Sequence, residues 1–244
     1  MTTPVNGAEP VLELRSVSAS YGPFRALFSV DLVVGAGEAI ALLGANGAGK
    51  TTVARVATGL VAPSSGEVRV GGRDMGGARA YEFARAGVVH APEGRSVFAT
   101  LTVEENLSLS FRQSRGKNGV RSGLDEAFAL FPVLRDRRHQ VAGTMSGGEQ
   151  RMLSMARVLV ESPSLLVADE LSLGLAPKVV DEVYASLAQL RDHGTALLIV
   201  EQFVGHALGL CDRVLMLHHG AVGWSGPSAE ARDRVWQDFG PASM

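Results

Sequence analysis

The sequence predicts an α/β fold in which helices cover a parallel β-sheet. Three short apolar runs, 39–43, 165–168 and 196–200, have the composition of strands that are buried on both faces. Between the last two runs, apolar residues recur at helical spacing at Val179, Val183, Leu187 and Leu190. A strand followed by a helix and then another strand is typical of a crossover between parallel strands.

Composition limits the classes of protein to consider. The chain has 244 residues, of which 46% are apolar and 20% are charged, and this balance favours a folded globular protein over a disordered one. A formal net charge of −2 argues against nucleic acid as the main partner. Cys211 is the only cysteine, so no internal disulfide can form, and the residue reads as a small apolar side chain.

No apolar run approaches the ~20 residues that a membrane-spanning helix needs. Residues 1–10 lack the basic start and apolar centre of a signal peptide and read as a loose tail. We therefore expect a cytoplasmic protein whose membrane role, if it has one, depends on a partner.

The first third of the chain alternates between strand and turn signals. Residues 11–17 alternate apolar and polar side chains, which predicts a half-exposed strand. A turn at 35–38 leads into the buried strand 39–43, and a glycine-rich loop follows it. Apolar residues at helical spacing come next, and Gly59 and Pro63 end that helix.

The pattern of apolar and polar residues changes between about residues 79 and 162, where it predicts mainly helices and polar loops. Within this part, 116–123 reads as an exposed loop. Because the buried-strand pattern resumes after it, we interpret this part as a helical segment inserted into the sheet, which implies two lobes. Near the end, His218, His219 and Gly220 separate two apolar strands and predict a hairpin turn rather than a metal site.

Residues 44–51, Gly-Ala-Asn-Gly-Ala-Gly-Lys-Thr, match the phosphate-binding pattern G-x-x-x-x-G-K-[ST], between a buried strand and a helix. Glycines allow backbone N–H groups to surround phosphate oxygens, and the helix dipole favours the same anion. The alternative is a glycine-rich turn, but this chain has only three lysines and one stands at the required position. The predicted nucleotide-binding residues are Gly44, Asn46, Gly47, Ala48, Gly49, Lys50, Thr51 and Thr52.

Two carboxylates, Asp169 and Glu170, follow the buried strand 165–168. At the end of this strand they can face the phosphate loop across the sheet. We expect Asp169, together with the Thr51 hydroxyl, to bind Mg²⁺, and Glu170 to act as the general base that polarises the attacking water. The alternative is that two acidic residues merely end a strand.

The segment Met145-Ser-Gly-Gly-Glu-Gln150 has both a structural and a functional interpretation. Ser146 and Glu149 match a capping box at the start of a helix. Capping does not explain Gly147 and Gly148, because glycine in a first turn costs stability. Unshielded N–H groups at a helix N-terminus form a phosphate site, and this second site makes sense if it closes over ATP that another subunit holds.

In this order, the phosphate loop, SGGEQ and the LLVADE strand resemble the ATPase subunit of ABC transporters over nearly the whole chain. The resemblance implies a P-loop NTPase core with an antiparallel β subdomain and an inserted α-helical subdomain. It implies a head-to-tail pair of subunits that binds two ATP molecules with Mg²⁺. It also implies that Tyr21 stacks on adenine, and that a second nucleotide contact is made by the signature residues Ser146, Gly147, Gly148 and Gln150.

By the same resemblance, one ABC ATPase domain comprises a core at 11–78 and 163–244 and a helical subdomain at 79–162. Residues 90–107 and 172–177 and the Val-Glu-Gln at 200–202 resemble the smaller ATPase subunit of branched-chain amino acid importers, and importers of urea and short-chain amides are close relatives. The partners so implied are integral membrane permease subunits, a second ATPase subunit and, indirectly, an extracytoplasmic solute-binding protein. We expect the protein to lie on the inner face of the cell membrane.

Three positions depart from the general ABC pattern. Glu93 stands where the loop that contacts Mg²⁺ usually carries glutamine, and a carboxylate there can still bind the metal. Gln202 stands at the catalytic switch position in place of histidine, so it can hydrogen-bond the γ-phosphate but cannot carry a proton. Leu171 replaces a proline, which we interpret as a local change in the loop.

Other functions are disfavoured by what the sequence lacks. A soluble ABC protein of the ribosome or of DNA repair usually has two cassettes or long helical insertions. A regulatory subunit without hydrolysis would not need the complete set of Lys50, Asp169 and Glu170. A P-loop GTPase would need an Asn-Lys-x-Asp segment, which this sequence does not contain.

Overall fold

The structure is a computed structural model that describes residues 9–91, 97–173, 176–201 and 204–231. The chain folds into two compact units, which are described one at a time. The first comprises residues 1–90, 164–170 and 187–244, and the second comprises residues 91–163 and 171–186.

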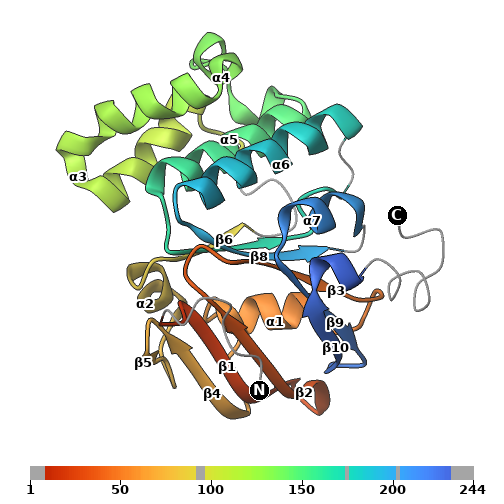
Figure 1. Cartoon of the computed structure of the whole chain (residues 1–244). Helices are drawn as coiled ribbons and strands as arrows, with labels where there is room; N and C mark the ends of the chain where they lie inside the picture. The colour runs from red at the N-terminus through yellow and green to blue at the C-terminus, as the bar shows by residue number, and fades with distance from the viewer. Residues whose placement is uncertain (1–8, 92–96, 174–175, 202–203, 232–244) are drawn as a thin grey trace. The chain divides into compact units, whose positions relative to one another are not determined.

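A six-stranded sheet forms the centre of the first unit (Figure 1). Its order is β10 (Ala221–Pro227), β9 (Arg213–His218), β3 (Ala39–Leu43), β8 (Ala196–Glu201), β7 (Leu165–Asp169) and β6 (Val88–Ala91). The pairs β3–β8, β3–β9 and β7–β8 are parallel, whereas β9–β10 is an antiparallel hairpin. The parallel sheet and the hairpin turn at His219–Gly220 confirm the predictions made from the sequence.

A second, four-stranded antiparallel sheet belongs to the same unit. Its order is β2 (Phe24–Val34), β1 (Leu12–Tyr21), β4 (Ser65–Val70) and β5 (Arg73–Asp74). The first strand is longer than the predicted segment 11–17, because its pairing with β2 continues to Tyr21 and Phe24. The α/β class, with a parallel sheet and a separate antiparallel sheet, is therefore confirmed.

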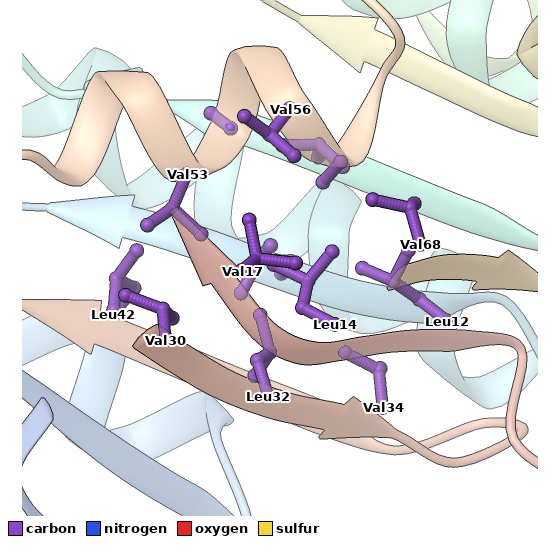
Figure 2. Close-up of a cluster of buried hydrophobic side chains, with 14 of the residues drawn as sticks. Leu12, Leu14, Val17, Val30, Leu32, Val34, Leu42, Val53, Val56 and Val68 are labelled. Carbon is purple, nitrogen blue, oxygen red and sulfur yellow. The ribbon is translucent and has the colours of Figure 1, made fainter. Parts of the chain in front are cut away.

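The hydrophobic core of the first unit lies between these elements. Helix α1 (Lys50–Ala57) directs Val53 and Val56 toward Val17 of β1 and Leu42 of β3, and all four side chains are buried (Figure 2). Helix α2 (Ala80–Arg85) adds Phe83 to the same core. Because Phe83 packs there, residues 79–90 lie with the first unit, whereas the predicted helical subdomain begins at 79. The domain boundaries given above remain a proposal.

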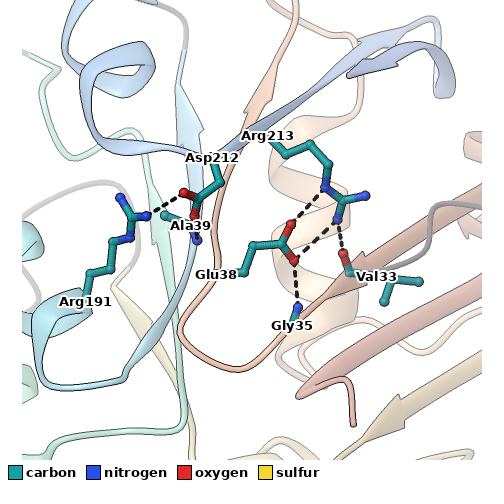
Figure 3. Close-up of polar contacts among 7 residues, drawn as sticks. All are labelled: Val33, Gly35, Glu38, Ala39, Arg191, Asp212 and Arg213. Carbon is teal, nitrogen blue, oxygen red and sulfur yellow. Dashed lines mark hydrogen bonds and ion pairs between the residues drawn. The ribbon is translucent and has the colours of Figure 1, made fainter. Parts of the chain in front are cut away.

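Polar contacts, of which those of Glu38 are buried, connect distant parts of the first unit (Figure 3). The Arg213 Nε donates to Glu38 Oε1 at 2.9 Å, and Glu38 Oε2 accepts from the Gly35 amide at 2.8 Å. Asp212 accepts from the Ala39 amide at 2.9 Å and pairs with Arg191. These bonds fix the start of β9 against the start of β3. Helix α7 (Val204–Leu210) ends just before this segment.

The second unit is helical. It contains α3 (Val103–Leu130), α4 (Pro132–Asp136), a short 3₁₀ turn (Ala142–Thr144), α5 (Gly147–Glu161) and the first part of α6 (Pro177–Asp192). Its buried core includes Leu107 and Phe111 of α3 and Leu153 of α5. The prediction of an exposed loop at 116–123 is wrong, because these residues lie within α3. Gly116 has a non-helical backbone conformation that kinks this helix, and Gly123 lies against Phe111. In the described part of the chain, no helix is long and apolar enough to cross a membrane.

Candidate functional site

The phosphate loop connects the C-terminal end of β3 to α1. Gly49 occupies the N-cap of α1 with φ 102°, and Gly47 has φ 79°, a conformation that glycine adopts without strain. Because the N-cap residue is a glycine, no side chain is present there to accept from the first N–H groups of the helix. These groups and the helix dipole therefore form an anion site at the end of the sheet.

Glycine is also required in this loop for space. A Cβ atom at Gly44 would lie 2.6 Å from the Leu217 carbonyl oxygen of β9. A Cβ atom at Gly49 would lie 3.0 Å from the Ala26 carbonyl oxygen of β2. The loop is consequently packed between two strands, and its backbone is held where the motif predicts it.

Lys50 is the first residue of α1, and its side chain is buried. Its Nζ donates to the carbonyl oxygens of Gly44 at 2.9 Å and Ala45 at 3.3 Å. The same Nζ lies 3.6 Å from Glu170 Oε1. The ammonium group thus lies over its own loop.

Two of the three predicted metal ligands, Thr51 and Asp169, lie side by side. The Thr51 Oγ1 is 3.4 Å from Asp169 Oδ1, although 118 positions separate them in the sequence. Asp169 is the buried last residue of β7, and β7 and β3 are both parallel neighbours of β8. Their carboxyl ends therefore reach the same edge of the sheet, as is typical of ligand sites in open α/β sheets.

Glu170 follows directly and has φ 49°, in the left-handed region that is unfavourable for a glutamate. Its amide donates to the Val200 carbonyl oxygen of β8 at 2.8 Å, which holds this backbone conformation. Strained residues of this kind gather at functional sites, and Glu170 is also part of the pocket wall.

A pocket of about 410 Å³ lies at this edge of the first unit. Six of the predicted nucleotide-binding residues are in its wall: Asn46, Gly47, Gly49, Lys50, Thr51 and Thr52. Sequence reasoning missed five further residues of the wall, namely Arg25, Ala26, Phe28, His219 and Gly220. They come from β2 and from the β9–β10 turn, and no motif marks them.

Tyr21 is not part of this pocket wall. It ends β1, and its hydroxyl accepts a hydrogen bond of 3.4 Å from Arg55 of α1. Adenine stacking on Tyr21 stays a prediction. Gly44 and Ala48 are likewise outside the wall; both are buried, Gly44 by Leu217.

The signature segment, residues 145–150, lies in the second unit, at the start of α5. The expected capping box is present: Ser146 Oγ accepts from the Glu149 amide at 3.3 Å, and Glu149 Oε2 accepts from the Ser146 amide at 2.9 Å. The bond from the Ser146 backbone lowers the pKa of the Glu149 carboxyl, and Ser146 Oγ and Arg137 contribute in the same direction. Gly147 is the first residue of α5.

Two other signature residues serve packing within this unit. A Cβ atom at Gly148 would lie 3.1 Å from Val179 Cγ2 of α6. Gln150 is buried, and its side-chain amide donates to the carbonyl oxygens of Ala142 at 2.8 Å and Met145 at 3.2 Å. The Gln150 amide is therefore engaged within its own unit, and its contact with nucleotide stays a prediction. Glu93 and Gln202, the predicted metal ligand and switch residue, lie outside the described residues.

Comparisons with known proteins agree with this arrangement. Residues 27–172, more than half of the chain, match the family model described as ABC transporter. The high-affinity branched-chain amino acid transport ATP-binding protein BraG of Pseudomonas aeruginosa is 41% identical over 87% of this chain and 91% of that protein. The probable branched-chain amino acid transport ATP-binding protein LivF of Archaeoglobus fulgidus is 34% identical over 90% and 93%.

A solved structure of an ATP-binding subunit of an ABC transporter is 26% identical, with a TM-score of 0.80 over 94% of this chain and 93% of that one. The fold, the order of the motifs and the extent of these matches lead to one conclusion. This chain belongs to the ABC transporter family.

Proposed function

We propose that this protein is an ATP-hydrolysing subunit of an ABC importer and powers uptake of branched-chain or other apolar amino acids. The observation that carries the proposal is the convergence of Lys50, Thr51 and Glu170 in the wall of one pocket of about 410 Å³, with Asp169 3.4 Å from Thr51. The branched-chain relatives support the cargo class.

The β- and γ-phosphates of ATP would lie on the N–H groups of the loop and on Lys50. Thr51 and Asp169 present two oxygen atoms 3.4 Å apart, and oxygen donors are what Mg²⁺ prefers, so the residues fit this metal. Bound Mg²⁺ would neutralise charge on the phosphates. Thr51 and Asp169 would orient it, and Thr52 would bind the inner part of the phosphate chain.

Glu170 is the proposed general base. Its carboxylate lies at the pocket wall, 3.6 Å from Lys50, and its strained backbone is held by Val200. A carboxylate at this place can accept a proton from a water that attacks the γ-phosphate. Gln202 would hydrogen-bond the γ-phosphate.

The transport cycle requires partners. A second ATPase subunit would complete the site by presenting its own Ser146-Gly147-Gly148 counterpart to ATP. Closure of the pair on ATP, and reopening after hydrolysis, would drive permease subunits between two states. A solute-binding protein would deliver cargo outside the cell, and this chain would act on the inner face of the membrane.

The purified Glu170→Gln protein tests the mechanism. We expect ATP binding to persist and steady-state hydrolysis, measured as phosphate release, to fall by about 10²-fold or more. Hydrolysis at the wild-type rate would overturn the role of Glu170.

The cargo is tested in the source cells, with the native gene replaced by the Glu170→Gln copy. Loss of labelled leucine uptake with normal urea uptake supports the branched-chain assignment. Loss of urea uptake alone would assign the same ATPase to urea or short-chain amides.

A further inference from the structure

One wall of the pocket is built from residues that no motif predicts. Strand β2 begins at Phe24, and its residues Arg25 and Phe28 line the pocket together with Gly47, Lys50 and Thr52. Arg25 is thus a second cationic side chain in the wall of the proposed phosphate site.

The guanidinium group of Arg25 is held in place by three contacts. Its Nη2 donates to Ser18 Oγ at 2.6 Å, and its Nε donates to the Leu27 carbonyl oxygen at 3.2 Å. Its central carbon lies 4.9 Å from the centre of the Phe28 ring, a cation–π distance. The two hydrogen bonds use two of the five N–H groups of an arginine, so donors remain for a ligand.

Backbone hydrogen bonds fix this wall to the phosphate loop. The Phe28 amide donates to the Gly220 carbonyl oxygen at 2.8 Å, and the Gly220 amide donates to the Ala48 carbonyl oxygen at 2.8 Å. The Ala26 carbonyl oxygen would lie only 3.0 Å from a Cβ atom at Gly49. Arg25 therefore has a defined position relative to the loop, in contrast to an arginine on a free surface.

The charges of the pocket favour an anion at Arg25. Within the residues that the structure describes, Arg25 forms no ion pair with a carboxylate, whereas Arg15, Arg69 and Arg213 pair with Glu13, Glu67 and Glu38. Lys50 shares its charge with Glu170. A nucleoside triphosphate carries more negative charge than Lys50 alone can balance, and arginine binds phosphate by directional, charge-assisted hydrogen bonds.

We propose that Arg25 is a second phosphate-binding cation of this pocket, positioned by Ser18 and Phe28, which binds the polyphosphate chain of the nucleotide together with Lys50. The inference rests on the proposed nucleotide site at the phosphate loop. It adds a residue from β2 to that site. This wall of the pocket would then contact the phosphates of the nucleotide and not its base.

The test compares two ligands, ATP and inorganic tripolyphosphate, which has the phosphates but no base or ribose. Their affinities are measured by titration calorimetry on the full-length Arg25→Gln and Arg25→Lys proteins. We expect Arg25→Gln to weaken both ligands by about tenfold, the value of one charge-assisted hydrogen bond, and Arg25→Lys to weaken both by less. The loss should shrink as salt concentration rises, because the contact is ionic.

Matched variants separate phosphate binding by Arg25 from a general effect of losing a positive charge. Arg73→Gln removes an exposed arginine of β5, at the opposite edge of the same antiparallel sheet and outside the pocket wall, and should leave both affinities unchanged. Phe28→Leu removes the ring under the guanidinium but keeps an apolar side chain. It should give a smaller, parallel loss for the two ligands if Phe28 is a positioning residue.

Unchanged affinity of Arg25→Gln for both ligands would overturn the inference. Weaker ATP binding with normal tripolyphosphate binding would also overturn it, because Arg25 would then contact the base or ribose. Lys50→Ala distinguishes failure of this inference from failure of the proposed function. If Lys50→Ala abolishes binding and Arg25→Gln does not weaken it, only this inference fails; if Lys50→Ala binds ATP normally, the proposed function fails as well.

Discussion

The Nζ atom of Lys50 lies 3.6 Å from the Oε1 atom of Glu170, and both residues line the pocket that the phosphate loop helps to form. One residue is proposed to bind the phosphates and the other to activate the water that attacks them. Their contact joins the two parts of the proposed reaction in one place. It also gives the buried ammonium group of Lys50 a nearby anion, which lowers the cost of its burial.

Lys50→Met keeps the length of the side chain and removes its charge. We expect the affinity for ATP to fall by about 10- to 100-fold, because a charged hydrogen bond to phosphate is lost. Calorimetric titration of the purified protein measures this. Lys178→Met, on the exposed start of α6, is the control and should bind ATP normally. Equal affinities of the two variants would contradict the role of Lys50.

Gly44→Ala would place a Cβ atom 2.6 Å from the Leu217 carbonyl oxygen. We expect the free energy of unfolding to fall by roughly 1–3 kcal/mol, because the loop or β9 must shift to avoid the contact. ATP affinity should fall with it. Gly205→Ala in α7 meets no atom within 4 Å and should be neutral or slightly stabilising. Urea denaturation of both variants provides the comparison, and equal stabilities would show that Gly44 is not packed as described.

The buried pair of Glu38 and Arg213 predicts a large effect on stability (Figure 3). Glu38→Gln leaves the Arg213 guanidinium without its anion and should cost about 3 kcal/mol of unfolding free energy. A double variant that also carries Arg213→Met should recover part of this loss, because the uncompensated charge is then gone. Glu67→Gln, at an exposed pair with Arg69, should change stability by less than about 1 kcal/mol. The prediction fails if the two single variants are equally stable.

Ser146 caps α5, so Ser146→Ala should destabilise the protein by about 1 kcal/mol, while Ser146→Thr should keep most of the stability. The measurement is the urea midpoint of each purified variant. If Ser146 also binds nucleotide of a partner subunit, Ser146→Ala should lower ATPase activity at temperatures where it is fully folded. A drop in activity without any loss of stability would contradict the capping role.

His90 predicts a dependence of stability on pH. Among the residues that the structure describes, its Nε2 is buried without a hydrogen-bond partner, and burial, aided by the charge of Arg55, lowers the pKa of this histidine from 6.5 to about 4. Because the folded pKa lies below the unfolded value, the unfolded chain binds more protons between pH 4 and 6.5. The contribution is present above pH 6.5 and is lost as pH falls toward 4.

The size of this effect can be measured directly. Between pH 7 and pH 5, His90 should account for about 1 kcal/mol of lost unfolding free energy, because solvent screens a side chain that is only partly buried. His90→Phe should remove that part, so the stability of the variant should fall less over the same interval. Urea denaturation at the two pH values gives the four free energies. Parallel losses in the two proteins would show that His90 titrates normally.

Much of the site could be predicted from the sequence, because its chemistry is local. Gly44, Lys50 and Thr51 belong to one continuous motif, whose glycines and helix start form a phosphate site without help from distant residues. The capping box of Ser146 and Glu149 and the turn at His219–Gly220 are local in the same sense. The exception is 116–123, where glycines suggested a loop: only Gly116 breaks the helix, and Gly123 makes room for Phe111.

The tertiary structure decided the contacts between residues that are distant in the sequence, because strand order and packing bring them together. Thr51 meets Asp169 because β3 and β7 are both parallel neighbours of β8, and Arg213 meets Glu38 across 175 positions. Arg25 enters the pocket wall only because β2 is hydrogen-bonded to the β9–β10 turn, which in turn holds the phosphate loop. The sequence by itself determined the phosphate loop, since backbone conformation there follows from neighbouring residues. The composition of the pocket wall was decided by the fold, since contacts between remote strands have no local signal.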